Sequence, residues 1–294
     1  MKTILITGAN GQLGRSLNRH THIPAHIPAQ DEYRYLFTDV DVLDICNKDA
    51  LMAYAGANEI DYLVNCAAYT AVDKAEDNEA ACLKINAEAV RNIGEVASVA
   101  GFKVIHISTD YVFDGTNSVP YVENDYTCPV SAYGRSKQTG ELMLRAVCPE
   151  AVIIRTSWLY SAYGDNFVKT MLRIGREREE IGVVSDQVGS PTWAGDLAEA
   201  ILRIIDNGVA GNFKAGIYHY SGEGVCSWYD FALKILRLSG IGCRVLPIET
   251  RDFPTKAVRP QYSVLNKRKI KQAHGLTIPH WEDSLREMLA GINE

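Results

Sequence analysis

A tyrosine and a lysine four residues apart, Tyr133 and Lys137, are the side chains of this sequence best placed for acid–base chemistry. They follow Pro129, and Ser131 is a candidate helix cap, so the spacing predicts that both lie on one helical face. A free phenol has a pKa near ~10, whereas a nearby lysine and an oxidised nicotinamide would stabilise the phenolate and lower that pKa. The pair therefore indicates a phenol tuned for proton transfer, although the same spacing is common on solvated helix surfaces.

Three polar residues, Ser108, Thr109 and Asp110, directly follow an apolar run that predicts a strand. In an open α/β sheet, ligands bind just beyond the carboxyl ends of the strands, so this position suits chemistry. We expect the Thr109 hydroxyl to hydrogen-bond the same carbonyl oxygen that Tyr133 would protonate.

Glycines at positions 8, 11 and 14 form a GxxGxxG turn between the first apolar run and a helix-like segment. Glycines let the backbone turn tightly and approach a pyrophosphate, and the free N–H groups at the helix start face its charge. The turn predicts a dinucleotide cofactor, against the alternative of an ordinary strand-to-helix connection.

Two acids are candidates for the adenosine end of that cofactor. Asp39 closes the second predicted strand, twenty-five residues after Gly14, somewhat beyond the usual offset of about 20 for a ribose-binding acid. The stretch from His20 to Asp31 is expected to be the loop that lengthens this offset, and a solvated turn acid is the alternative reading of Asp39. Asp44 lies either beside the adenine or at a helix cap.

The elements that must position these groups alternate between short β-branched apolar runs and longer amphipathic stretches. This alternation predicts an α/β fold of Rossmann type, a doubly wound parallel sheet with helices on both faces. One helix is expected over Glu79 to Ala100, ending at Gly101. We predict a dinucleotide-binding domain over residues 1–156, its sheet completed by parts of 189–221, and a smaller, less regular substrate lobe over most of 157–294. The predicted strands are centred on residues 3–6, 35–37, 62–64, 104–107 and 152–154.

The composition restricts the partners. Thirty basic and thirty-six acidic residues give a net charge of −6 without long single-sign runs, so neither nucleic acid nor an anionic membrane is expected as a partner. The seven cysteines contain no CxxC pair, so we expect neither a disulfide framework nor a metal site. No apolar run reaches membrane-spanning length and no cleavage-site pattern follows Met1, so we expect a cytoplasmic protein with a small-molecule partner.

In this order and at these distances, the glycine turn, the Asn65–Ala68 segment, Ser108–Asp110 and Tyr133–Lys137 resemble the extended short-chain dehydrogenase/reductases. Longer stretches are similar to the dTDP-4-dehydrorhamnose reductase family, and the likeness covers nearly the whole chain. The resemblance implies reduction of the C4 ketone of a dTDP-linked 4-keto-6-deoxyhexose to dTDP-L-rhamnose by NADH or NADPH. These stretches are Asn65–Glu76, Ser108–Gly115, Arg155–Tyr160, Asn166–Arg173 and Asp186–Thr192.

The resemblance also assigns roles. Tyr133 would be the proton donor, Lys137 would bind the nicotinamide ribose and assist it, and Thr109 would polarise the ketone. Asp110 and Trp158 would hold the sugar, although Trp158 also reads as a plain core aromatic. The other cofactor-binding candidates are Gly8, Gly11, Gln12, Leu13, Gly14, Asp39, Asp44, Ile45, Ala68, Tyr69 and Thr70, and the weaker substrate-binding candidates are Asn166, Gln187 and Arg259.

Some questions stay open at this level. Asp39 favours NADH, but Arg15 and Arg34 are expected to permit NADPH, so dual use with a modest NADH preference is predicted. Some family members are dimers bridged by magnesium through a glutamate at the position of Arg15, so this chain is expected to be a monomer or a homodimer without that metal. A dehydratase or 4-epimerase, a reductase of another deoxysugar, and a non-catalytic binding subunit remain as alternatives, and Tyr111 stands where dehydratases place a glutamate.

Overall fold

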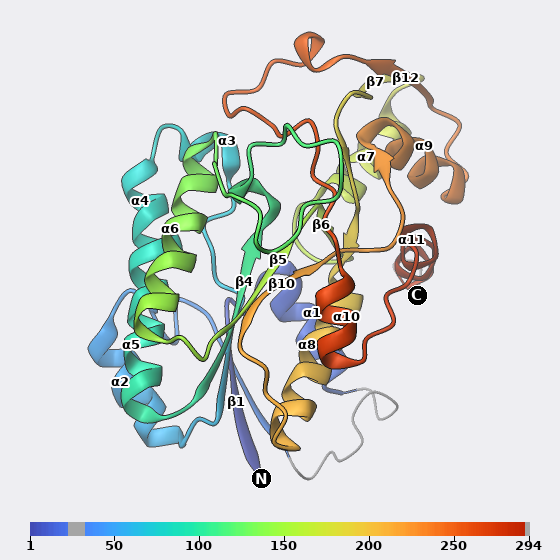
Figure 1. Ribbon diagram of the computed structural model, residues 1–294. Coiled ribbons are helices and arrows are strands. Elements are labelled where there is room, and N and C mark those ends of the chain that lie inside the picture. Colours follow the sequence, from blue (N-terminus) through green and yellow to red (C-terminus); the bar gives the residue numbers. More distant parts are fainter. Residues whose placement is uncertain (23–32, 292–294) are drawn as a thin grey trace.

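The computed structural model describes residues 1–22 and 33–291, so most of the loop expected between His20 and Asp31 lies outside the described residues. A parallel six-stranded sheet forms its centre, in the order β10-β5-β4-β3-β1-β2 (Figure 1). This is the doubly wound α/β arrangement that the sequence predicts. Its strands are β1 (Lys2–Thr7), β2 (Tyr33–Thr38), β3 (Tyr62–Asn65), β4 (Lys103–Thr109), β5 (Val152–Thr156) and β10 (Gly216–Tyr220).

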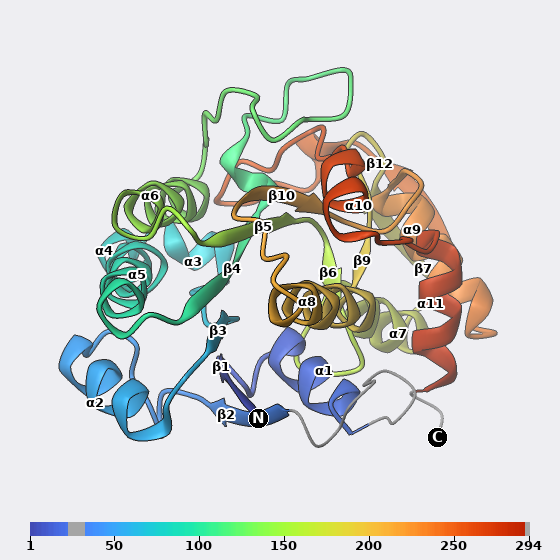
Figure 2. The ribbon, with the colours of Figure 1, turned by 60° about the horizontal axis from the view of Figure 1, so that its bottom comes forward.

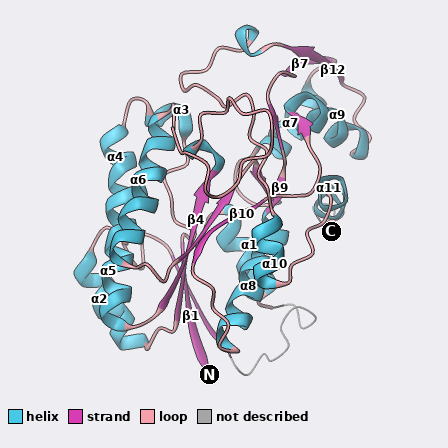
Figure 3. Ribbon diagram, in the orientation of Figure 1, coloured by secondary structure: helices cyan, strands magenta, loops and turns pink. Residues whose placement is uncertain are grey.

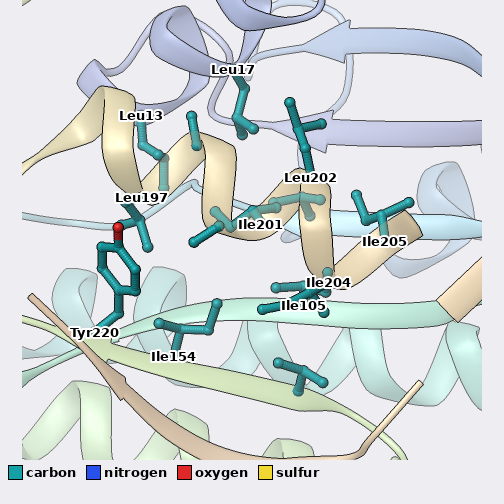
Figure 4. Packing of buried hydrophobic residues seen from close by; sticks show 14 of the residues in the cluster. Leu13, Leu17, Ile105, Ile154, Leu197, Ile201, Leu202, Ile204, Ile205 and Tyr220 are labelled. Atoms are coloured by element: carbon teal, nitrogen blue, oxygen red, sulfur yellow. The ribbon is translucent and has the colours of Figure 1, made fainter. Parts of the chain in front are cut away.

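Helices cover both faces of this sheet (Figure 2). Helices α2 (Lys48–Asn58), α5 (Ala89–Ala100) and α6 (Ala132–Val147) lie on one face, and α1 (Gln12–His20) and α8 (Ala194–Val209) lie on the other. Because both faces are buried, the strands are continuous apolar runs such as the Ile4-Leu5-Ile6 segment of β1. Figure 4 shows side chains of α1 and α8 packed together over β4 and β5.

The helix expected over Glu79 to Ala100 is helical throughout but not uniform. Its first part, α4 (Glu79–Leu83), passes through a π-helical turn (Lys84–Glu88) into α5, which ends at Gly101 with φ of 83°. A Cβ on Gly140 of α6 would lie 2.0 Å from the Asn86 carbonyl oxygen of the π-turn. The glycine therefore lets the two helices approach where the π-turn bulges.

A smaller region with its own apolar core lies beyond the carboxyl ends of the strands, at the upper right of Figure 1. It contains the two-stranded pairs β7–β12, β8–β11 and β6–β9 (Figure 3). Tyr262 makes one isolated bridge with Val188 of β8. The elements of this region are β6 (Leu159–Tyr160), α7 (Phe167–Glu177), β7 (Glu180–Val184), β8 (Val188–Gly189), β9 (Thr192–Trp193), β11 (Cys226–Ser227), α9 (Trp228–Leu238), β12 (Arg244–Ile248) and α11 (Trp281–Ala290), while α10 (Arg268–His274) lies beside β10.

Within the described residues, no helix is long and apolar enough to cross a membrane. The seven cysteines are free thiols. No cluster of His, Cys, Asp or Glu in that part of the chain has the arrangement of a metal site.

Candidate active site

The glycine turn has the tight backbone that a bound pyrophosphate requires. Gly8 has φ of +65°, and a Cβ there would lie 2.6 Å from the Ala67 nitrogen. A Cβ on Gly14 would lie 2.4 Å from the Gly8 carbonyl oxygen. Helix α1 starts at Gln12, and its N-cap residue Gly11 supplies no side-chain hydrogen bond. The N–H groups of this first turn are therefore suited to an anion.

One cavity of about 940 Å³ runs from this turn across the carboxyl ends of the strands. This volume lies at the upper end of the range for sites that bind small molecules. It brings together most of the residues that the sequence predicts for cofactor and chemistry. Those that line it are Gly8, Gly11, Gln12, Leu13, Asp39, Asp44, Ile45, Ala68, Thr70, Thr109, Asp110, Tyr133, Lys137 and Trp158.

The two acids predicted for the adenosine end of a cofactor, Asp39 and Asp44, line this cavity and are held by backbone N–H groups. Asp39 accepts hydrogen bonds from Asn10 at 2.9 Å and from Val40 at 2.8 Å. Asp44 accepts from the Cys46 N–H at 2.9 Å. The cap of α2 is instead Asn47, so the alternative reading of Asp44 as a helix cap is wrong.

Tyr133 lies in the first turn of α6, where the helix start is fixed on both sides. The Ser131 side chain accepts from the Gly134 N–H at 3.1 Å and caps the helix. A Cβ on Gly134 would lie 2.3 Å from the Tyr111 carbonyl oxygen, so α6 begins directly against the short 3-10 turn Asp110–Val112. The rings of Tyr111 and Tyr133 meet edge to face with centroids 5.5 Å apart. Tyr133 thus faces the strand end that carries Thr109.

Burial dominates the electrostatics of Tyr133. It raises the pKa of the Tyr133 phenol, and the hydrogen bond with Thr109 only partly offsets this effect. The nearby Lys137 ammonium donates to the Ile107 carbonyl at 2.7 Å. The phenol is therefore held in its protonated form.

Burial also shifts the pKa values of Lys137 and Asp110. It lowers the pKa of Lys137 to about 8, while Glu141 opposes the shift. It raises the pKa of Asp110 to about 6, and hydrogen bonds from Ser263 and Thr109 oppose that shift. Thr109 Oγ1 donates to Asp110 Oδ1 at 3.0 Å.

Trp158 has a strained backbone and a position at the cavity wall. Its φ of 49° lies in the left-handed region, which non-glycine residues rarely adopt. Its indole is stacked on Trp228 with centroids 3.6 Å apart, and a Cβ on Gly189 would collide with it. Strain of this kind is maintained where the surrounding structure fixes a side chain for a role.

Five predicted residues lie outside the cavity lining. Gly14 is buried inside the turn, and the backbone of Tyr69 is bonded at its N–H and carbonyl to the Asn86 side chain. Asn166 caps α7 and donates to Gln12 Oε1 at 3.0 Å, and Gln187 donates to Thr250. Arg259 donates to the Tyr111 hydroxyl at 3.0 Å and to Asp73 at 2.5 Å.

Sequence reasoning missed three buried or bridging polar residues: Asn86, Glu141 and Asp73. Asn86 lies four residues after Cys82 in the amphipathic helix predicted over Glu79 to Ala100, so a polar residue on its apolar face was a signal that could have found it. Glu141 lies four residues after Lys137, on a face with no apolar pattern to mark it as buried. Asp73 carries no such signal, because its partner Arg259 is remote in the chain.

A doubly wound sheet with a glycine turn at its first crossover and a Tyr-x-x-x-Lys helix over its strand ends defines an oxidoreductase of the short-chain dehydrogenase/reductase class. The comparisons with known proteins narrow this class. The chain matches the family described as RmlD substrate binding domain over residues 1–293, and it belongs to that family.

Full-length relatives agree with this assignment. The chain is 40% identical to a dTDP-4-dehydrorhamnose reductase of Aggregatibacter actinomycetemcomitans, covering 99% of both chains. A solved dTDP-4-dehydrorhamnose reductase of Clostridium acetobutylicum superposes with a TM-score of 0.92 at 41% identity, covering 99% of this chain and 100% of that one. The Bacillus anthracis enzyme in complex with NADP superposes at 0.90 with 38% identity and the same coverage.

Proposed function

We propose that this protein reduces the C4 ketone of dTDP-4-dehydrorhamnose to give dTDP-L-rhamnose, with a nicotinamide cofactor. The observation that carries the proposal is the meeting of Tyr133 and Thr109 inside a cavity that continues to the glycine turn. The names of the relatives from Aggregatibacter actinomycetemcomitans and Clostridium acetobutylicum support the same substrate.

The residues of the cavity can hold a dinucleotide. The turn at Gly8 and Gly11 leaves room for a pyrophosphate, Asp39 lies at the ribose end, and Ala68 and Thr70 line the middle. When bound, the reduced nicotinamide supplies a hydride to the ketone carbon. We propose dual use of NADH and NADPH with a modest NADH preference, because the Asp39 carboxylate suits a free 2′-hydroxyl and repels a 2′-phosphate.

Tyr133 is proposed as the donor that protonates the developing alkoxide. Its raised pKa keeps the phenol protonated at neutral pH, which is the form that a donor needs. Thr109 is proposed to hydrogen-bond the same oxygen, and Lys137 to bind the nicotinamide ribose. Asp110 and Trp158, which both line the cavity, are proposed to hold the sugar through the carboxyl group and the stacked indole.

A dehydratase needs an acid–base group that removes the C5 proton, and Tyr111 is poorly suited to that step. Its hydroxyl accepts from Arg259, and burial raises its pKa. A 4-epimerase or a reductase of another deoxysugar shares the remaining machinery, and a non-catalytic binding subunit would not need Thr109, Tyr133 and Lys137 to meet in one cavity.

The lobes are proposed to divide the work. Residues 1–156, with the returning strand β10, would bind the cofactor, and most of 157–294 would bind the nucleotide-sugar. Arg15 does not offer a carboxylate to a bridging metal, and its guanidinium lies 4.7 Å from the Tyr163 ring centroid. A monomer or a homodimer without bridging magnesium is therefore proposed, in the cytoplasm.

The test is the oxidation of NADH or NADPH, followed at 340 nm, on addition of freshly prepared dTDP-4-dehydrorhamnose. We expect turnover with both cofactors and one product with the L-rhamno configuration. Tyr133→Phe is the matched negative control. Cofactor binding without turnover on this substrate would favour the non-catalytic subunit, and turnover on another 4-keto sugar alone would change the substrate.

A further inference from the structure

A fully buried ion pair lies directly behind the catalytic residues. Glu141 of α6 and Arg155 of β5 have side chains that are 3% and 4% exposed. The guanidinium grips the carboxylate with two nitrogens, Nη2 to Oε2 at 2.7 Å and Nε to Oε1 at 3.0 Å. Ser108 Oγ donates a third hydrogen bond to Oε1 at 2.5 Å. All the contacts of this carboxylate are therefore directed at the sheet.

These bonds join the elements that carry the reacting groups. Glu141 follows Lys137 by one helical turn, and Ser108 directly precedes Thr109. In the β4–β5 ladder, Ser108 lies opposite Arg155. The carboxylate thus ties the inner face of α6 to the end of β4 at one point.

Arg155 extends the same network to the 3-10 turn. Its guanidinium lies 5.1 Å from the ring centroid of Phe113, the residue that ends the turn Asp110–Val112, and it also donates to the Glu123 carbonyl. Three segments of the active site therefore share one buried pair: the helix of Tyr133, the strand end of Thr109 and the turn of Asp110.

We propose that Glu141, held by Arg155, is a positioning residue of this active site. It fixes α6 against the strand end that carries Thr109, and it places a carboxylate one helical turn from the Lys137 ammonium. The inference deepens the proposed function and rests on it for its kinetic consequences.

Stability alone gives little reason for such a pair. Taking two charges out of water is costly, and well-packed apolar residues often replace a buried ion pair with no loss of stability. A positioned charge, in contrast, cannot be supplied by an apolar side chain. The pair is therefore better explained by what it does to its neighbours.

Glu141 is the carboxylate among the groups that face Lys137. From β4 comes His106, whose pKa burial lowers well below its usual value, so the ring is neutral. From the segment after β3 and from α4 come the thiols of Cys66 and Cys82, whose pKa values burial raises. From α6 come Tyr133, a protonated phenol, and Glu141. Removal of the Glu141 charge should therefore lower the pKa of Lys137 further.

The decisive variant is the double substitution Glu141→Leu/Arg155→Met, which removes both charges and keeps the volume apolar. We expect kcat to fall about tenfold or more, and the basic limb of the kcat–pH profile to move down by about one pH unit, a tenfold change in the protonation equilibrium. The matched control is Glu79→Gln, which breaks the half-exposed ion pair between Glu79 of α4 and Arg135 of α6. It should leave kcat and its pH profile unchanged.

A second measurement does not need turnover. The Lys137 side chain is titrated by NMR in wild type and double variant, and its pKa should be lower in the variant. Superimposable titrations and pH profiles would overturn the proposal and leave the pair a purely structural role. If wild type shows no turnover with dTDP-4-dehydrorhamnose, the proposed function fails, while the titration still tests the charge at Glu141.

A milder variant separates position from charge and serves if the double variant does not fold. Ser108→Ala removes one bond of the network and keeps both charges. We expect a several-fold loss in kcat with an unchanged pH profile, because the Glu141 carboxylate loses one of its hydrogen bonds but keeps its charge and its arginine. Unchanged kcat in this variant would contradict the tie between α6 and β4.

Discussion

Two arginine–carboxylate pairs lie beside residues of the candidate active site, and they differ in their access to water. Arg155 and Glu141 are 4% and 3% exposed. Arg259 and Asp73 are 24% and 44% exposed, and Arg259 also donates to the Tyr111 hydroxyl. The first pair joins a strand and a helix of the central sheet, whereas the second joins α3 (Val72–Ala75) to the segment that follows β12.

This difference in exposure predicts that the Arg155–Glu141 pair is permanent, whereas Arg259 can exchange Asp73 for a ligand. A half-exposed ion pair contributes little to stability, about 0–1 kcal/mol, so an anionic ligand can compete for its arginine. A buried bidentate pair cannot be broken without leaving an unpaired charge in a dry interior. We therefore expect the buried pair to hold the residues of the chemistry in place, and the half-exposed pair to be the one that a substrate diphosphate can reach.

The largest effect on turnover is expected at Tyr133. Tyr133→Phe deletes the donor hydroxyl and keeps the ring that meets Tyr111, so kcat should fall about 10²- to 10⁴-fold with nearly unchanged cofactor affinity. Steady-state kinetics and cofactor titration check both values. Near-normal turnover would remove Tyr133 from its proposed role.

Lys137→Met tests whether one ammonium serves both chemistry and cofactor. We expect kcat to fall about 10²-fold and cofactor affinity to fall with it, because the side chain is proposed to bind the ribose as well as assist Tyr133. Fluorescence titration with NADH measures the second effect. A loss confined to kcat would mean that Lys137 does not contact the ribose.

The two ion pairs are compared by replacing the arginine of each pair with methionine. Arg155→Met leaves Glu141 buried and unpaired and should cost about 3–5 kcal/mol of unfolding free energy. Arg259→Met should cost no more than about 1 kcal/mol, because Asp73 stays half in water. Chemical denaturation of both variants measures the loss in unfolding free energy. Equal losses would contradict the distinction between the two ion pairs.

Arg259→Ala tests whether Arg259 recognises the nucleotide-sugar. If Arg259 exchanges Asp73 for the substrate diphosphate, the KM for the nucleotide-sugar should rise about tenfold, consistent with a lost charged hydrogen bond. The KM for NADH should stay the same. Lys256→Ala is the matched control, since Lys256 pairs with Asp77 in the same segment. Unaltered KM values would limit Arg259 to holding Tyr111.

The smallest effect is expected at the far end of the cavity. Asp39→Ala removes a carboxylate that would repel a 2′-phosphate, so the ratio of kcat/KM values should move several-fold toward NADPH, a change of about 1 kcal/mol. Parallel assays with both cofactors measure it. An unchanged ratio would place Asp39 outside the adenosine pocket.

Local patterns in the sequence were enough to predict the sheet, the glycine turn and the helix of Tyr133 and Lys137. Strand runs, helix caps and glycines act over a few residues, so they are legible in the chain itself. The ion pair of Asp73 and Arg259 joins positions far apart in the sequence, and only the fold brings them together.

The same limit explains two further differences. The π-turn at Lys84–Glu88 depends on the close approach of Gly140 from another helix, which no periodicity within the turn reveals. The burial of Tyr133, which raises the pKa of its phenol, was not predicted from the sequence. The degree of burial follows from packing around the side chain and not from its spacing to Lys137.

The return of the chain to the central sheet has a consequence for synthesis on the ribosome. When residue 156 has emerged, β5 is an open edge strand, and the apolar face of Ile105 and Ile154 still lacks α8. Both are covered only after β10 has been made, about sixty residues later, a delay of several seconds at ordinary elongation rates. During that interval the nascent chain exposes an unpaired strand edge and an uncovered apolar sheet face. A fragment truncated after residue 156 should therefore aggregate and not fold as an isolated domain.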